Sequence, residues 1–147
     1  MLRTRLLRNM SSYTERMAKT GRPISPHITI YAFPTIAWSS VVVRATGMVL
    51  TIGTTGIACM ALTGGSDKPA RLASELASSS AAPLAKFAVG FPLTYHFLGA
   101  IRHTYWDLTA KGFTNAQMLQ SSYALMGTAT IISLALATAE LRPRRDD

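Results

Sequence analysis

The chain has 147 residues, enough for one domain, and a net charge of +8. Its mean hydropathy is +0.21, and 48% of its residues are hydrophobic. The basic residues concentrate at the two ends, whereas a nucleic-acid-binding surface spreads them over a folded face. This distribution argues against a nucleic-acid partner and favours a membrane protein.

The N-terminal segment, residues 1–22, is polar and basic and carries a single acid, Glu15. Residues 1–20 are rich in Arg, contain Ser and are poor in acids, which is typical of a mitochondrial presequence. A basic flank on the inner side of a membrane has the same composition, and both interpretations stay open. We expect residues 1–35 to precede the membrane domain and residues 142–147 (RPRRDD) to form a polar tail.

Three apolar blocks follow, at about 36–62, 83–105 and 118–141. Each is close to the ~20 residues that a helix needs to span the hydrocarbon core, and a lone span in lipid must be a helix. Helices of a soluble bundle keep a charged stripe toward water, and these blocks have almost none. The sequence therefore predicts an all-α domain over 36–141 with three transmembrane helices.

Polar connections separate the blocks. Residues 63–82 are rich in Gly, Ser and charge and are predicted to form a loop, in which Arg71–Leu76 can make a short surface helix. Residues 107–115 are predicted to form a tight polar turn. The Lys and Arg counts near the span ends favour the N-terminus inside, in the matrix or cytoplasm. Cys59 is the sole cysteine, so the chain forms no intrachain disulfide.

The second block places His96, Arg102 and His103 at membrane depth, where ionisable residues are expensive and are functional candidates. Imidazole is a common haem ligand. The alternative, which helix context alone favours, is a histidine hydrogen-bonded to a neighbouring helix. His96 and His103 are two turns apart, ~10.5 Å along the axis, so they cannot hold both sides of one iron. A second ligand to a haem on His96 would come from elsewhere. Another polypeptide is favoured over His27, the remaining histidine, because His27 precedes the first span.

Small residues and a proline lie close to His96. Gly99 and Ala100 are its neighbours on the helix surface and leave space for a flat macrocycle or for another helix. Pro92 removes a backbone hydrogen bond and predicts a kink. Arg102 is nearer the interface, where it either meets haem propionates or snorkels toward phosphates.

The first block carries Ser40 and Arg44 four residues apart, on one face of the helix. Together they can build a polar pocket for a quinone, whose carbonyl accepts hydrogen bonds and gains negative charge on reduction. Snorkelling by Arg44 is the alternative, which the sequence alone slightly favours. Two stripes of small residues at four-residue spacing predict close helix packing. They consist of Gly47, Thr51 and Thr55, and of Ala129, Ser133 and Ala137.

Two stretches of the chain resemble the cytochrome b large anchor subunit of succinate dehydrogenase (mitochondrial complex II). The first is Arg22–Tyr31 (RPISPHITIY), continuing through Ser40 to Arg44–Gly47. The second is Phe91–His96 (FPLTYH), continuing through Gly99–His103 to Trp106 and Asp107. The resemblance covers roughly residues 20–140, and its identity at the level of motifs is confined to these two stretches.

The resemblance implies three transmembrane helices that pack with a small anchor subunit into a haem-binding bundle. It implies that His96 is one axial ligand of haem b, that the small anchor subunit supplies the other, and that Ser40 and Arg44 line the ubiquinone site. Arg44, Arg102 and His103 are then expected near the haem propionates. Val43 departs from the family, since many members have histidine there, and any role of that histidine is absent or reassigned.

The resemblance also implies partners and a location: an iron–sulfur subunit with the clusters, a flavoprotein subunit with FAD, and the mitochondrial inner membrane, with the N-terminus in the matrix. The chain alone is expected to catalyse nothing, and one cysteine cannot hold a cluster. Two alternatives are a haem-free structural anchor and a small transporter or channel subunit. The transporter would use Arg44, Arg102 and His103 as a polar path, but it gives no reason for the Arg22–Tyr31 stretch.

Overall fold

The computed structural model describes residues 13–22 and 31–139. The expectations for the presequence, for most of the Arg22–Tyr31 motif and for the polar tail fall on residues 1–12, 23–30 and 140–147, which lie outside the described residues. The chain divides into two compact units, residues 1–33 and 34–147. Each unit is described by itself below.

The described part of the first unit contains a short helix, α2 (Tyr13–Lys19). Glu15 lies in its first turn and Lys19 in its last, which matches the partial charges at the two helix ends. Further along the chain, the rings of Tyr31 and Phe33 pack edge to face with their centroids 5.3 Å apart.

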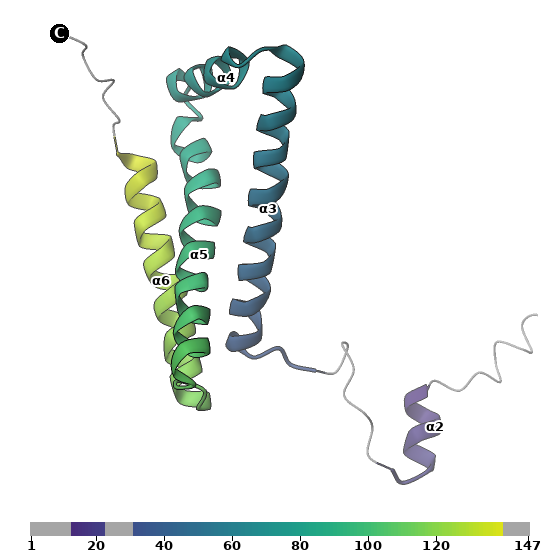
Figure 1. Cartoon of the computed structure of the whole chain (residues 1–147). Coiled ribbons are helices and arrows are strands. Elements are labelled where there is room, and N and C mark those ends of the chain that lie inside the picture. Colours follow the sequence, from purple (N-terminus) through teal and green to yellow (C-terminus); the bar gives the residue numbers. More distant parts are fainter. Residues whose placement is uncertain (1–12, 23–30, 140–147) are drawn as a thin grey trace, which may run out of the picture. The chain divides into compact units, whose positions relative to one another are not determined.

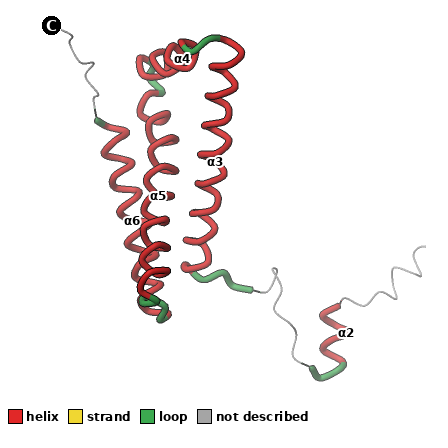
Figure 2. The backbone as a smooth tube through the Cα atoms, viewed as in Figure 1, coloured by secondary structure: helices red, strands yellow, loops and turns green. Residues whose placement is uncertain are grey.

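The second unit is an antiparallel arrangement of long helices (Figure 1). Helix α3 (Thr35–Gly64) runs up, α4 (Asp67–Ser78) crosses its far end, α5 (Ala82–Thr109) runs down, and α6 (Asn115–Thr138) runs up again. Short connections join these helices (Figure 2). Helix α5 contacts both α3 and α6, and α3 and α6 also contact each other directly.

The three long helices have 30, 28 and 24 residues and are long and apolar enough to cross a membrane. This confirms the three predicted apolar helices. Large apolar side chains point outward, and along α3 Met48, Ile52 and Leu62 are 66%, 69% and 86% exposed. A surface of this kind is suited to lipid or to apolar partner helices rather than to water.

The connections differ in part from the prediction. The predicted loop 63–82 contains all of α4, twelve residues, so the short helix expected at Arg71–Leu76 is present and longer. The predicted turn 107–115 is wrong at its start, because α5 continues to Thr109. The reversal takes place after Ala110, which caps α5 with a left-handed φ of 50°, and it ends where the Thr114 hydroxyl caps α6.

Small and polar residues form the contact between α5 and α6. Ser122, Ala129, Ser133 and Ala137 are buried along one face of α6, which confirms close packing of the predicted Ala129–Ala137 stripe. The other predicted stripe packs only at its first member within this chain, since Thr51 and Thr55 on α3 are exposed.

The core of the bundle lies nearer the end where α3 begins. Tyr95, Leu125 and Ala129 form its buried centre, with Val42, Val43, Phe91 and Leu98 packed around them. At the other end Lys86 donates a hydrogen bond of 2.8 Å to the carbonyl of Ala139 at the close of α6. A cation near a helix C-terminus is favourable, so this bond gives Lys86 a place within an apolar helix.

Candidate functional site

His96 lies on α5 where that helix meets α3. Its Nδ1 is 3.0 Å from the backbone carbonyl oxygen of Val43, and a carbonyl only accepts, so Nδ1 carries the proton. In the neutral ring Nε2 then has the free lone pair that binds a metal. A histidine that ligates a metal usually donates its other N–H in this way. The ring is therefore in the tautomer that a haem ligand requires.

Gly47 of α3 makes space for the His96 ring. A Cβ at position 47 would lie 2.8 Å from His96 Cε1 and 3.2 Å from Nδ1, closer than real Cβ atoms approach a ring. Any side chain there would push the imidazole away. The absence of a Cβ at Gly47 is thus a condition for the observed position of His96.

Gly99, one turn beyond His96, receives a side chain of α3. A Cβ on Gly99 would lie 2.8 Å from Cγ2 of Val43, so the space beside Gly99 is occupied by that valine. Gly99 therefore leaves space for another helix, α3, rather than for a flat macrocycle. Contact with another helix is the second of the two possibilities predicted for it. Ala100 remains exposed. Pro92 is buried within α5, which continues through it as one helix.

Ser40 and Arg44 lie on α3 beside the His96 contact. Ser40 is half-buried and Arg44 is exposed. They flank Val43, whose carbonyl accepts from His96, and Gly47 is one turn further on. Neither side chain makes a hydrogen bond or ion pair with another described residue. Their polar atoms therefore remain available to a ligand or to a partner chain.

Arg102 joins all three long helices. Its Nη1 donates to Ser122 Oγ of α6 and its Nη2 to Ser39 Oγ of α3, each at 3.2 Å. Its guanidinium carbon also lies 4.8 Å from the centre of the Trp106 ring, a cation–π distance. The Nε atom is buried and has no hydrogen-bond partner among the described residues. Arg102 is thus a half-buried cation whose Nε has no acceptor among the described residues.

Tyr95 also bonds to Ser39, the residue of α3 that accepts from Arg102. Its hydroxyl lies 3.3 Å from both the carbonyl oxygen and Oγ of Ser39, to which it donates. Tyr95 is 1% exposed, and Ser39 and Ser122 are fully buried. We call Ser39, Tyr95, Arg102 and Ser122 the interhelical polar cluster.

His103 is exposed and belongs to an aromatic group at the same end of the bundle. Its ring packs edge to face on Trp106, with centroids 5.2 Å apart, and Trp106 packs on Phe113 at 5.5 Å. Trp38 and Tyr105 are exposed at this end too. Aromatic residues of this kind are enriched where membrane meets water.

Sequence reasoning missed three members of the polar cluster. Ser122 had a usable signal, since stepping back along α6 from Ala129 by seven residues extends the small-residue stripe to it. Ser39 and Tyr95 had no usable sequence signal. Each is adjacent to a residue that the sequence analysis singled out, Ser40 and His96, and adjacent residues point to different sides of a helix.

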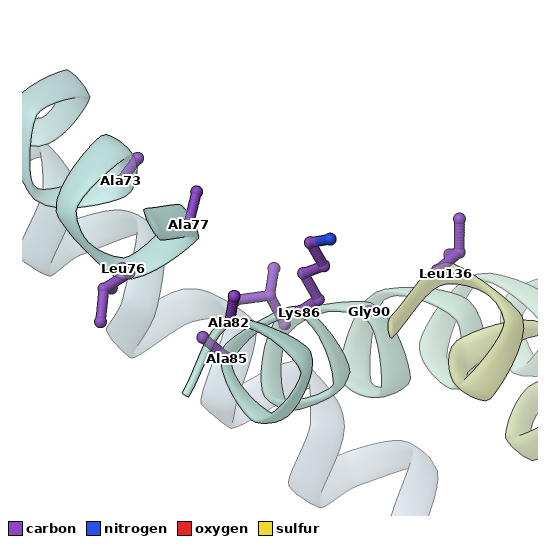
Figure 3. A pocket seen from close by; sticks show the side chains of 9 residues that line it. Ala73, Leu76, Ala77, Ala82, Ala85, Lys86, Gly90 and Leu136 are labelled. Carbon is purple, nitrogen blue, oxygen red and sulfur yellow. The ribbon is translucent and has the colours of Figure 1, made fainter. Parts of the chain in front are cut away.

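The opposite end of the bundle holds an apolar cavity of about 360 Å³ between α4, α5 and α6 (Figure 3). Leu76 and Ala77 approach it from α4, and Leu136 from α6 (Figure 3). Among the described residues that line it, Lys86 is the charged one, and its Nζ is bonded to Ala139. The described lining is therefore apolar and does not offer the convergent polar groups that fix the orientation of a polar ligand.

Comparison with known families gives a match over most of the chain. The model of the succinate dehydrogenase/fumarate reductase transmembrane subunit matches residues 18–137. This range includes α3, α5, all of α6 but its last residue, and every candidate site residue described above.

Curated relatives agree with the family match. The mitochondrial succinate dehydrogenase cytochrome b560 subunit of Dictyostelium discoideum is 40% identical over 115 residues, covering 76% of this chain and 59% of the relative. The Homo sapiens subunit of that name is 34% identical over 131 residues, covering 87% and 77%. The succinate dehydrogenase cytochrome b556 subunit of Paracoccus denitrificans is 28% identical over 122 residues, covering 78% and 88%. The chain thus spans less than two thirds of the Dictyostelium relative.

Proposed function

Because the chain belongs to the succinate dehydrogenase/fumarate reductase transmembrane subunit family, we propose that it is a membrane-anchor subunit of a succinate:ubiquinone oxidoreductase. The names of the relatives support a mitochondrial membrane, and we place the chain in the inner membrane with its N-terminus in the matrix. In this proposal residues 1–35 are the basic matrix-side segment and residues 36–141 the membrane domain.

The proposal assigns the chemistry with succinate to partner subunits. A flavoprotein subunit with FAD oxidises succinate, and an iron–sulfur subunit passes the electrons to ubiquinone at the membrane. A small anchor subunit packs against the long helices of this chain. The wide exposure of apolar side chains on α3 supports a contact with lipid and with such a partner.

We assign one axial ligand of a shared haem b to Nε2 of His96. The hydrogen bond from Nδ1 to Val43 and the space at Gly47 support this assignment, since they hold the ring in one tautomer and one position. The second ligand would come from the small anchor subunit. When bound, the haem supplies reversible one-electron chemistry.

We place Arg44, Arg102 and His103 near the haem propionates. The buried Nε of Arg102 has no acceptor within the described part of the chain, and a carboxylate is the acceptor that a guanidinium pairs with best. Two of the five N–H donors of Arg102 are engaged by serines, which leaves the Nε–H to pair with a propionate.

We propose that Ser40 and Arg44 bind the quinone head group. The Ser40 hydroxyl can donate to a quinone carbonyl, and the charge of Arg44 can stabilise the negative charge that develops there on reduction. One observation carries the proposal: His96 packs against Val43 and Gly47, and so lies beside the face of α3 that presents these two unpaired polar side chains.

The test is succinate-driven reduction of a ubiquinone analogue by the complex, purified in mild detergent through a tag on this chain. Ser40→Ala and Arg44→Ala should each lower turnover about 10-fold or more, because each removes a group that acts on the developing charge. Succinate-dependent reduction of a soluble dye, which takes electrons from the partner subunits, should stay unchanged and serves as the control.

Two results would contradict the proposal. An intact assembly with no succinate-dependent turnover would favour the transporter or channel subunit. An active assembly whose optical spectrum lacks haem would favour the haem-free structural anchor.

A further inference from the structure

Helix α3 packs against α5 and α6 mainly along its first half, and its far end contacts α4. Its two buried residues are Ser39 and Thr46, and every residue from Thr51 to Cys59 is exposed. The glycines Gly53 and Gly56 have open space where a Cβ would be. The position of α3 relative to α5 and α6 is therefore set by a few contacts near its N-terminal end.

Those contacts lie on both sides of the proposed quinone ligands. On one side, Ser39 receives hydrogen bonds from Tyr95 and Arg102. On the other, Val43 fits beside Gly99 and Gly47 fits beside His96. Ser40 and Arg44 alternate with these contact residues along α3. Ser40 directly follows Ser39, and Arg44 lies between Val43 and Gly47.

Among the polar contacts of α3 with the other long helices, the Ser39 contact is fully buried, whereas the Thr35–Tyr123 hydrogen bond is exposed and the His96–Val43 bond is half-buried. The Ser39 side chain connects α3 to α5 directly and to α6 through Arg102. A serine oxygen has two acceptor positions, and here Tyr95 and Arg102 take them. Arg102 in turn holds Ser122, so the connection runs from α3 through α5 to α6. Because Ser39 and Ser122 are fully buried, water does not reach them to replace a lost partner, which makes this bonded geometry the preferred one.

From this arrangement we infer that Ser39 is a positioning residue for the quinone site, acting through Arg102 and Ser122 to hold Ser40 and Arg44 where a quinone can meet them. The inference rests on the proposed function of Ser40 and Arg44. Ser39 does not touch the quinone, because its side chain is fully buried among α5 and α6. Its effect comes from alignment, to which hydrogen bonds to a ligand are sensitive.

The experiment measures KM and kcat for a ubiquinone analogue in the purified complex. Ser39→Ala removes the hydroxyl acceptor of Arg102 and leaves Tyr95 only the backbone carbonyl of residue 39, so it should raise the KM about 3- to 10-fold, the equivalent of one hydrogen bond. Ser39→Thr keeps the hydroxyl and should return the KM to within about 2-fold of wild type. Ser122→Ala loses one bond of Arg102 and should give a smaller rise, which keeps the test possible if Ser39→Ala fails to assemble.

Ser133→Ala is the matched control. Ser133 is also fully buried, but its hydroxyl bonds only to Ala129 of its own helix. The Ser133→Ala variant loses a buried hydroxyl but no contact of α3 with another helix. The KM of this variant for the quinone analogue should therefore equal that of wild type. Equal effects of Ser39→Ala and Ser133→Ala, or a fall in complex yield with an unchanged KM, would overturn the positioning role.

Ser40→Ala in the same series separates the two proposals. If Ser40→Ala raises the KM or lowers kcat and Ser39→Ala does neither, the quinone site stands and the positioning role is overturned. If neither Ser40→Ala nor Arg44→Ala affects quinone reduction, the quinone site itself is elsewhere and both proposals fail.

Discussion

At the scale of single residues, two glycines determine what α3 can bring to α5. Gly47 admits the ring of His96 and Gly99 admits the side chain of Val43. Both are contacts in which the missing Cβ matters more than backbone freedom, because each lies within a helix. Val43 takes part in both contacts, since its side chain packs beside Gly99 and its backbone carbonyl accepts from His96.

Gly47→Ala should displace His96. The new Cβ would lie 2.8 Å from Cε1, so the ring must move and its bond to Val43 must lengthen. We expect the complex to lose most of its haem absorbance or to show a shifted spectrum, measured as the reduced-minus-oxidised difference per flavin. The control is Gly53→Ala, which has the same gain in helix propensity but open space around its Cβ. An unchanged haem spectrum in Gly47→Ala would argue against His96 as the ligand.

At the scale of the elements, α5 holds the bundle together through two different interfaces. Its contact with α6 is long and built from small buried residues, whereas its contact with α3 is short and depends on Ser39, Val43 and Gly47. Membrane helices gain little from apolar contact as such, since lipid is equally apolar, so close fit and hydrogen bonds decide which surfaces pair.

Gly99→Ala should loosen α3 from α5. Its Cβ would lie 2.8 Å from Val43 Cγ2, and overpacking of this kind costs about 1–3 kcal/mol. The thermal midpoint of the purified complex should fall by several degrees, and Val43→Ala in the same chain should recover much of the loss by making space. Gly90→Ala is the control, because its Cβ would make an ordinary contact of 3.9 Å with Leu136. Additive losses in the double variant would disprove a direct contact between positions 43 and 99.

At the scale of the whole membrane unit, the antiparallel helices collect polar function at one end. Ser40, His103 and the interhelical polar cluster lie where α3 begins, α5 ends and α6 begins, with an aromatic group beside them. The other end carries the amphipathic helix α4 and the apolar cavity. This asymmetry suits the proposed function, in which the subunit meets soluble partners and a quinone on one side of the membrane.

Three spans place successive connections on opposite sides of the membrane, which single cysteines can test. In a Cys59→Ser chain, Ser79→Cys and Lys111→Cys introduce thiols at exposed positions before α5 and after it. In sealed mitochondria stripped of their outer membrane, a membrane-impermeant maleimide should label position 79 and leave position 111 unlabelled until the membrane is opened. Labelling of both positions before opening would contradict the orientation, and labelling of 111 alone would invert it.

Much of this architecture follows from the sequence alone. Three apolar stretches of sufficient length determine three long helices, because an isolated chain in lipid must satisfy its own backbone groups. The spacing of His96 and His103 requires any second ligand on a haem at His96 to come from elsewhere, since helix geometry fixes their separation. The family follows from Arg22–Tyr31 and Phe91–His96 together.

Only the tertiary structure decided which residues meet across helices. Period and spacing place a residue on a face of its own helix, but the rotation and offset of two helices depend on side-chain fit along both. This is why Ser39 rather than Ser40 bonds to Arg102, why Val43 fills the space beside Gly99, and why Nδ1 of His96 meets a backbone carbonyl. These contacts join residues more than fifty positions apart, and no local pattern encodes them.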